Sequence, residues 1–210
     1  MLSWLFAKYY DRLIADAEEK CLHEWRASLL KNVSGRVLEM GCGTGANLPY
    51  YNANIEHLAL AEPNVHMRQR VLEKLPQYPN LNVKILDYHG ETIPSPDQTY
   101  DAVVSTLVLC TVEDPQKILE EIYRVLKPQG RFVFLEHVAA ENNPSRYKWQ
   151  KRLEPIWKII GHGCHLTRST EQSIVQAGFK IEEITRESMR GVPPFVRPSI
   201  RGKATKNLTP

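Results

Sequence analysis

Cysteines and long apolar runs are scarce in this sequence of 210 residues. Its 4 cysteines are scattered, with no C-x-x-C pair and no disulfide-like spacing, which excludes a small disulfide-stabilised secreted domain and favours a reducing cytoplasm. The apolar run in MLSWLFAKYY is far shorter than the roughly 20 residues needed to span a bilayer, and no small-residue cleavage site follows it. We therefore expect a cytoplasmic protein without a signal peptide or a membrane-spanning anchor.

The N-terminal stretch nevertheless has a helical pattern. Its apolar residues recur at the spacing of an amphipathic helix: they are Leu2, Leu5, Phe6, Tyr9, Leu13 and Ala17. Such a stripe most often covers the rest of the domain. Peripheral contact with a membrane surface is the alternative interpretation.

Basic residues are concentrated in the C-terminal third. Residues 146–210 hold 13 of the 27 Lys and Arg but only 5 of the 24 Asp and Glu, a net charge of +8 against −5 for the rest. This asymmetry favours an anionic partner or surface only weakly, because solvated helix faces often have it. No basic platform interleaved with aromatic residues accompanies it, so nucleic acid is not an expected partner.

From Arg36 onward, β-like segments alternate with helix-like ones. The β-like segments are short, apolar and rich in Val, Ile, Leu and Phe, which is typical of strands buried on both faces of a parallel sheet. They cover residues 36–40, 57–62, 83–86, 100–106 and 131–137, and a last pair is expected at 180–184 and 199–206. We find no internal repeat and no second domain. The sequence therefore predicts a single α/β domain.

Two helices carry terminal signals. Asp114 and Pro115 are a cap and first-turn pair at the start of one helix. In the other, Ser169 and Gln172 predict a capping box, and Gly178 suits the left-handed position after the last turn.

Three of the 11 glycines fall within the segment GCGTG at 41–45, directly after the first predicted strand. This G-x-G-x-G bend is one residue short of the dinucleotide fingerprint, in which backbone amides and a helix N-terminus face a pyrophosphate. Glu39 ends the strand, and we expect its carboxylate to point toward the same mouth. At about 4 Å, two like charges repel by roughly 4 kcal/mol at an effective dielectric near 20. The bend therefore favours a phosphate-free cation, S-adenosylmethionine, over NAD.

A second acid follows the second predicted strand, in Ala61-Glu62-Pro63-Asn64. An acid about 20 residues past the glycine bend is placed to accept hydrogen bonds from ribose hydroxyls. Alone, Glu62 would be a solvated loop acid, but together with the bend it is an expected cofactor ligand. Cys42 has no adjacent base or resolving cysteine, so we expect it to pack inside the bend rather than react.

These motifs resemble the class I S-adenosylmethionine-dependent methyltransferases, nearest the branch of the ubiquinone and menaquinone C-methyltransferases. The resemblance covers about residues 35–138 through VLEMGCGTGAN, AEPN, YDAVVSTLVLCTVEDPQKILEEIYRVLKPQG and FVFLEHV, in that order. It implies a Rossmann-like, seven-stranded, mostly parallel sheet with helices on both faces and an antiparallel last strand.

The resemblance also implies a division of the chain and a set of cofactor contacts. The parts are an N-terminal helical cap (1–34), a cofactor-binding core (35–138), an acceptor-site insertion (139–168) and a closing helix with strands (169–210). His89, Gly90 and Glu91 would lie by the adenine, and Thr106 and Leu107 by the methionine part. The expected cofactor-binding residues are Glu39, Gly41, Cys42, Gly43, Gly45, Asn47, Glu62, Pro63, Gly90, Glu91, Thr106 and Leu107.

A narrower resemblance links the C-terminal half to the microsomal alkyl-thiol S-methyltransferases of animals. It rests on GETIP, STLVLCTV, LEHVAAE, KWQKRLEPIWKII and GCHLTRS. Those relatives carry a long hydrophobic N-terminal anchor, where this chain has only a short stretch. The resemblance implies methyl transfer to a small hydrophobic acceptor, with a thiol favoured. Two alternatives stay open: a quinone or phospholipid methyltransferase at a membrane surface, and a non-catalytic binding module that keeps the cofactor fold.

The expected catalytic residues are Glu136 and His137, because ligands of open α/β sheets bind at the carboxyl ends of the strands. Alternation along the strand directs only one of them into the crevice, and His137 is the favoured one. The segment GHGCH, with His162, Cys164 and His165, suggests a metal site but has no clearly matched distant ligand. Methyl transfer from a sulfonium needs no Lewis acid. We therefore expect no metal, and a loop that lines the acceptor pocket.

The insertion itself is rich in large apolar side chains. They are Tyr147, Trp149, Leu153, Ile156, Trp157 and Ile160. Most are expected to pack in the core. Together with the N-terminal helix, the insertion predicts an apolar roof over the acceptor.

Overall fold

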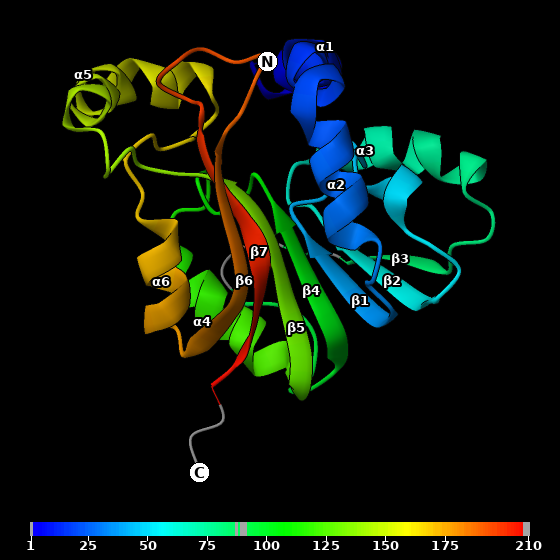
Figure 1. Cartoon of the computed structure of the whole chain (residues 1–210). Coiled ribbons are helices and arrows are strands. Elements are labelled where there is room, and N and C mark those ends of the chain that lie inside the picture. Colours follow the sequence, from blue (N-terminus) through cyan, green and yellow to red (C-terminus); the bar gives the residue numbers. More distant parts are fainter. Residues whose placement is uncertain (1, 87, 89–91, 208–210) are drawn as a thin grey trace.

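The computed structural model describes residues 2–86, 88 and 92–207, with side chains from residue 4 onward. Its strands form one seven-stranded sheet in the order β3-β2-β1-β4-β5-β7-β6 (Figure 1). β1 to β5 pair in parallel, whereas β7 is antiparallel to both of its neighbours. The strands are β1 Gly35–Met40, β2 Ile55–Ala61, β3 Val83–Leu86, β4 Tyr100–Thr106, β5 Leu126–His137, β6 Phe179–Ser188 and β7 Pro198–Lys206. The predicted fold class is confirmed.

Helices cover both faces of the sheet, which is why its central strands are apolar throughout. On one face the core includes side chains of α4 (Pro115–Val125) and α6 (Thr170–Gln176). On the other face it includes side chains of α2 (His23–Leu30) and α3 (Val65–Lys74). The shorter helical turns are η1 Glu18–Leu22, η2 Leu48–Tyr50 and η3 Leu75–Gln77.

The predicted helix ends are confirmed in part. The Asp114 carboxylate accepts hydrogen bonds from the backbone N–H groups of Gln116 and Lys117, so it caps α4 as expected. Gly178 has φ +90 and is left-handed, also as expected. The capping box is wrong, because the Ser169 hydroxyl makes no capping bond and donates to the Glu141 carboxylate instead.

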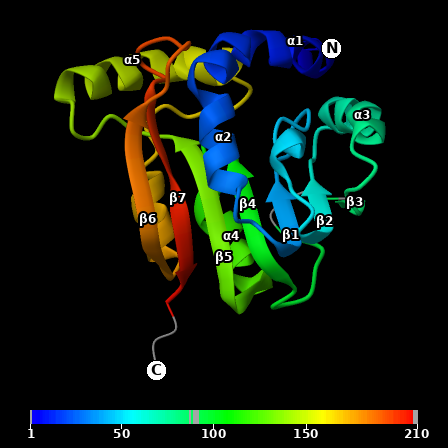
Figure 2. The ribbon, with the colours of Figure 1, turned by 45° about the vertical axis from the view of Figure 1, so that its right-hand side comes forward.

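Two helices, α1 (Leu2–Ala17) and α5 (Pro144–Ile160), lie across the end of the sheet at which the parallel strands finish (Figures 1 and 2). Their packing differs from the expectation. Leu13 of α1 is 65% exposed and Ile160 of α5 is 62% exposed, and Trp149 and Ile156 are exposed as well. The prediction that most of the insertion's large side chains pack in the core is wrong. These three positions of α5 are exposed and the other three are only partly buried, because the helix lies across the end of the sheet rather than inside the fold.

Among the described residues, no helix has both the length and the apolar composition to cross a bilayer.

Candidate active site

The glycine bend begins where β1 ends. Gly41, Gly43 and Gly45 all have positive φ, which a side chain at those positions would oppose. A Cβ on Gly41 would overlap Val108, and one on Gly45 would overlap Leu48. At Gly43 the nearest atom to such a Cβ is 4.0 Å away, so this glycine borders open space. The bend thus offers backbone without a side chain to an approaching ligand.

No α-helix follows the bend between Gly41 and Asn64, a stretch that the structure describes completely. Turns lead only into the three-residue η2, in place of the long helix of a dinucleotide site. The positive end of a helix is what holds a pyrophosphate in such sites. Its absence at this bend argues against a dinucleotide, independently of any charge on Glu39.

Glu62 ties the bend to the end of β2. Its carboxylate accepts hydrogen bonds from the backbone N–H of Gly43 at 2.9 Å and of Asn64 at 2.8 Å. Burial raises the pKa of Glu62 above its ordinary value. A carboxylate has further lone pairs besides the two used here, and these can accept ribose hydroxyls. The neighbouring Pro63 is exposed beside it.

Glu39 lies deeper than the sequence suggests. It is 1% exposed, and its carboxylate accepts hydrogen bonds from Asn47 Nδ2 at 2.9 Å and Tyr51 Oη at 2.8 Å. Burial raises its pKa to about 7. The Glu39 carboxylate thus lies among buried hydrogen-bond partners, and its burial disfavours the charged form. The carboxylate keeps unused lone pairs through which it can hold an ammonium group.

An arginine that the sequence analysis missed completes this network. The Arg26 guanidinium on α2 is buried and donates to Asn47 Oδ1 at 2.8 Å and Thr106 Oγ1 at 3.0 Å. Asn47 Nδ2 also donates to Thr106 Oγ1 at 3.0 Å. Three predicted cofactor residues, Glu39, Asn47 and Thr106, therefore belong to one buried network, in which Arg26 binds Asn47 and Thr106, and Asn47 binds Glu39. The signal of Arg26 in the sequence was a charge within the apolar stripe of a helix, where it needs a partner.

Helix α1 closes over the same place. Asp11 accepts a hydrogen bond from the Thr44 hydroxyl of the bend at 2.5 Å and pairs with Lys74 of α3 at 3.0 Å. The ring centroids of Phe6 and His162 lie 3.9 Å apart. Burial raises the pKa of Tyr10 to about 12. Side chains of the N-terminal helix thus contact both the bend and the loop after α5.

Glu136 sits beneath the loop that follows β4. Its carboxylate accepts hydrogen bonds from Ser105 Oγ at 2.7 Å, Leu109 N at 3.0 Å and Val108 N at 3.3 Å. Burial raises its pKa to about 7. The group is completely buried and its partners are protein groups, so it fixes the loop and does not fit the predicted catalytic role. The loop also holds Leu107, whose φ of +60 turns the chain away from β4.

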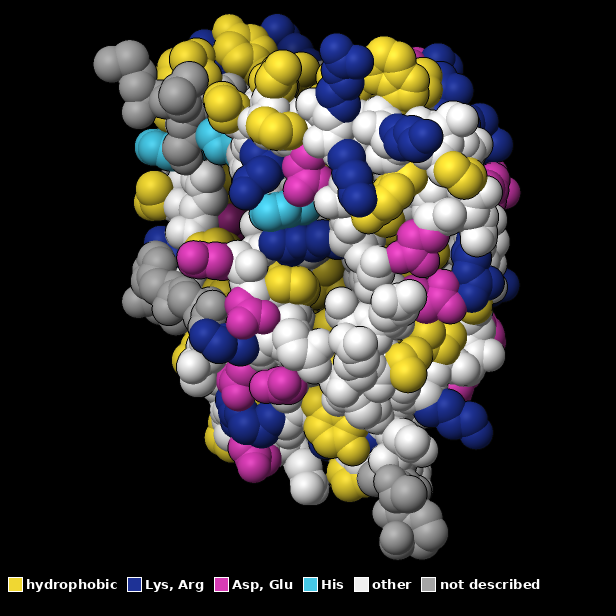
Figure 3. All heavy atoms as spheres, turned by 90° about the vertical axis from the view of Figure 1, so that its left-hand side faces the viewer, with side chains coloured by type: hydrophobic (Ala, Val, Ile, Leu, Met, Phe, Trp, Pro, Cys, Tyr) yellow, Lys and Arg dark blue, Asp and Glu magenta, His cyan; other side chains and the backbone are white. Residues whose placement is uncertain are grey.

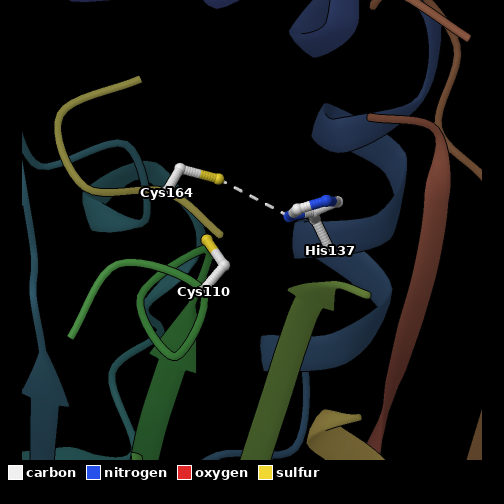
Figure 4. A group of neighbouring side chains, drawn as sticks. All are labelled: Cys110, His137 and Cys164. Atoms are coloured by element: carbon white, nitrogen blue, oxygen red, sulfur yellow. Dashed lines mark hydrogen bonds between the residues drawn. The ribbon is translucent and has the colours of Figure 1, made fainter. Parts of the chain in front are cut away.

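His137 points in the other direction, toward Cys164 (Figure 4). Its Nδ1 lies 3.6 Å from Cys164 Sγ, and Cys110 joins them, so that one ligand atom from each lies within 4.8 Å of the others. His137 is 2% exposed, and its Nε2 has no hydrogen-bond partner among the described residues. Hydrogen bonds from the Cys110 thiol and from His137 lower the pKa of Cys164. His162 and His165 do not join this cluster, since His165 Nδ1 pairs with Glu154 at 3.3 Å.

Gly90 and Glu91, with His89, lie outside the described residues, so their predicted place by the adenine stays a prediction. Cys42 is buried in the bend, and burial raises its pKa well above the ordinary value, as a packing role requires.

The bend, the Glu62 carboxylate and the buried network fit S-adenosylmethionine. Gly43 leaves space for backbone contact, and Glu62 retains acceptor capacity for hydroxyls. Glu39 and Asn47 are buried and hydrogen-bonded to each other. A cationic group of the cofactor near them would favour the charged form of Glu39.

Comparison with known proteins gives consistent results. The methyltransferase-domain family matches residues 38–134, and the N-terminal part of anamorsin matches 91–178. A thiol S-methyltransferase of Rattus norvegicus is 39% identical over 185 residues, which cover 84% of this chain and 74% of that protein. A phosphatidylethanolamine N-methyltransferase of Cereibacter sphaeroides is 30% identical, over 78% of this chain and 79% of its own. The crystal structure of an S-adenosylmethionine-dependent methyltransferase from Mesorhizobium loti has a TM-score of 0.64 at 19% identity. The match covers 92% of this chain and 100% of that one.

Glu62→Ala should weaken the binding of S-adenosylmethionine at least tenfold, which corresponds to a loss of about 1.4 kcal/mol or more of binding free energy. The variant lacks the carboxylate that would accept the ribose hydroxyls and that holds the bend in place. Isothermal titration calorimetry measures this directly. Glu56→Ala, at an exposed acid of β2, the strand that precedes Glu62, is the matched control and should bind normally. Unchanged affinity in the Glu62 variant would remove this residue from the cofactor site.

Glu136→Gln should change the pH dependence of stability. The folded-state pKa of Glu136 is raised to about 7 from an ordinary 4.5, so its contribution is present below pH 4.5 and lost as the pH rises through 7. Relative to the Gln variant, the wild type should lose up to about 3 kcal/mol of unfolding free energy between pH 4.5 and pH 8. Urea denaturation across this range tests it, with the exposed Glu19→Gln as control. Parallel curves for wild type and Glu136→Gln would show that the acid is not destabilised by burial.

Proposed function

The chain belongs to the S-adenosylmethionine-dependent methyltransferases, in the family of the thiol S-methyltransferases, and we propose that it methylates the sulfur of a small hydrophobic thiol. The family resemblance inferred from the sequence is confirmed. Membership also sets aside the alternative of a non-catalytic binding module. Thiol S-methyltransferases of rat, human and mouse are 36–40% identical to this chain over most of its length, and this similarity carries the choice of acceptor.

Methyl transfer from a sulfonium requires little from the protein beyond alignment of the acceptor with the methyl group. When bound, the cofactor supplies a methyl group attached to a cationic sulfur. The carbon of this methyl group is already activated for transfer. Holding an acceptor in line with that carbon can supply roughly 7–11 kcal/mol. The bend and Glu62 would hold the adenosine part, and α1, which contacts both the bend and the loop after α5, would shield the bound cofactor from water.

The proposed place of the acceptor is beside Cys110, His137 and Cys164, and it suits a thiol. These residues lie in the loop after β4, at the end of β5 and in the loop after α5. A thiol of pKa near 8.5 is a few per cent thiolate at neutral pH, so it needs only modest help with its proton. His137 is the proposed source of that help, because it is buried there and Glu136 is occupied elsewhere. A phenol or an alcohol would need a stronger base.

A second candidate, methyl transfer to a quinone or a phospholipid at a membrane surface, is favoured by the exposed apolar side chains of α1 and α5. Figure 3 shows such side chains beside Lys and Arg at the end of the molecule where α5 lies. The large exposed ones are Trp4, Leu5, Tyr9 and Leu13 on α1, and Trp149, Ile156, Ile159 and Ile160 on α5. Apolar side chains with a basic rim are typical of helices that lie on anionic membranes. Peripheral membrane contact through this face, and a cytoplasmic location, are part of this proposal.

A methyl-transfer screen with radiolabelled S-adenosylmethionine distinguishes the two candidates. We expect label in small alkyl and aryl thiols without vesicles. Quinones and phospholipids presented in anionic vesicles are the comparison, and the same thiols with empty vesicles control for effects of the membrane on the enzyme. Labelled lipid or quinone together with inert thiols would overturn the thiol assignment in favour of the second candidate.

His137→Ala should lower kcat for a thiol by about 10- to 30-fold at pH 7, since the variant must rely on the thiolate already present. The deficit should shrink as the pH approaches the pKa of the thiol, and the affinity for S-adenosylmethionine should stay within about twofold. Steady-state kinetics from pH 6.5 to 9 and calorimetry measure both, with His66→Ala on α3 as control. Full activity at pH 7 would remove His137 from the reaction.

A further inference from the structure

The group formed by Cys110, His137 and Cys164 is built from three segments that are far apart in the sequence. Cys110 lies in the loop after β4, His137 ends β5 and Cys164 lies in the loop after α5. Their ligand atoms face one another, and each lies within 4.8 Å of the other two (Figure 4). We propose that these three side chains bind one thiophilic divalent cation, with Zn²⁺ as the best match, and leave one coordination position open toward the acceptor.

The distances suit a tetrahedral site. With bonds of about 2.3 Å to sulfur and about 2.05 Å to nitrogen, tetrahedral zinc places a sulfur and a nitrogen ligand about 3.6 Å apart. The distance from Cys164 Sγ to His137 Nδ1 is 3.6 Å. Two sulfur ligands would be about 3.8 Å apart, which is within the 4.8 Å that bounds the cluster. The sulfur–nitrogen distance thus matches tetrahedral zinc, and the third ligand atom lies within reach of the same cation.

The donor set selects the kind of cation. Two thiolates and one imidazole are soft or intermediate ligands, and there is no carboxylate among the three, which favours zinc over magnesium or calcium. Two thiolates balance the charge of a divalent cation, so the buried site is neutral overall. Three protein ligands with a free fourth position are characteristic of catalytic rather than structural zinc. Cys164 is the one ligand that is partly exposed, so the open position is on its side.

Hydrogen bonds hold the three segments together. The backbone N–H of His165, next to Cys164, donates to the carbonyl of Cys110 at 2.8 Å. Glu136, next to His137, accepts from Val108 and Leu109, close to Cys110. Arg168 donates to the carbonyls of Leu109 and Val112 on the same loop. Each ligand is thus fixed by its neighbour in the sequence, as outer-shell groups fix metal ligands.

The site explains what the segment GHGCH alone did not. The sequence suggested His162 and His165 as companions of Cys164, but these histidines contact Phe6 and Glu154. The matched distant ligands are instead Cys110 and His137, which only the fold brings near. With Nδ1 on a cation, His137 keeps its proton on Nε2, the buried atom without a partner among the described residues. That N–H is then available to the acceptor.

The cation would give His137 its part in the reaction, and this step rests on the proposed thiol acceptor. A thiol that takes the fourth position loses its proton to solvent, since a coordinating thiol is deprotonated. A sulfur lone pair of the bound thiolate would then form the new bond to the methyl carbon, while the methyl–sulfonium bond breaks and its electron pair passes to the cofactor sulfur, which leaves as a neutral thioether. The product is a neutral thioether, a weaker ligand that can leave. No electron is gained or lost by the cation.

Cobalt substitution tests the site apart from any activity. The full chain, stripped of metal under reducing conditions, is titrated with Co²⁺ and followed by its tetrahedral d–d absorption and its thiolate-to-cobalt charge-transfer absorption. We expect one equivalent of Co²⁺ with both signals, and displacement of both by Zn²⁺. Cys110→Ser and Cys164→Ser should each reduce the charge-transfer signal and weaken binding by about 100-fold or more, since even outer-shell changes cost 10- to 100-fold. Cys21→Ser, a buried cysteine on η1, is the control and should bind Co²⁺ normally.

Circular dichroism of each variant shows that it is folded, and the partly exposed Cys164 is the safer position if Cys110→Ser unfolds. As a further measurement, Zn²⁺ should protect Cys164 of the wild type from alkylation. Absence of tetrahedral cobalt signals, or signals that survive in both Ser variants, would overturn the site. An alkyl thiol added without S-adenosylmethionine should shift the cobalt spectrum. If the metal binds but the thiol leaves the spectrum unchanged, the site stands and its proposed part in methyl transfer is overturned, whether or not thiols are methylated.

Discussion

Three buried carboxylates at the carboxyl ends of parallel strands determine how the loops of this site are arranged. A buried acid must be hydrogen-bonded to be tolerated. Glu62 after β2 takes its donors from the glycine bend, Glu136 on β5 takes them from the loop after β4, and Glu39 on β1 takes them from Asn47 and Tyr51. Glu62 and Glu136 therefore each fix the loop that follows a neighbouring strand, β1 and β4, and Glu39 fixes the segment that follows its own strand. Hydrogen bonds to buried carboxylates therefore position both the loops at the proposed cofactor site and the loop beside the proposed acceptor site.

This arrangement explains why the buried acids can be tolerated in a binding site. Burial raises the pKa of Glu39 and Glu136 to about 7, so both lie near the point of protonation in the ligand-free protein. A cation that arrives beside Glu39 favours its charged form, whereas an anion would meet no helix terminus at the bend. The proposed preference for a positively charged adenosine compound thus rests on the missing helix as much as on the acid.

Much of the fold followed from the sequence because strand burial leaves a direct pattern. The apolar segments predicted a parallel α/β sheet, and the family resemblance carried by the motifs implied its seven strands and its antiparallel last strand. The residues that the sequence did not predict have a different physical cause. Arg26, Cys110 and the true partners of Cys164 depend on contacts between segments far apart in the chain, and a single sequence shows such contacts only as a charge or a thiol in an apolar stretch. The exposed side chains of α5 were mistaken for core because apolar character alone does not distinguish a core from an outward docking face.

The central claim is that the mouth formed by the glycine bend and Glu62 accepts a phosphate-free adenosine cation. Paired calorimetric titrations of the wild-type protein with S-adenosylmethionine and with NAD⁺ test it most directly. We predict saturable one-to-one binding of S-adenosylmethionine and no measurable heat of binding for NAD⁺. Binding of NAD⁺ with no binding of S-adenosylmethionine would contradict the account.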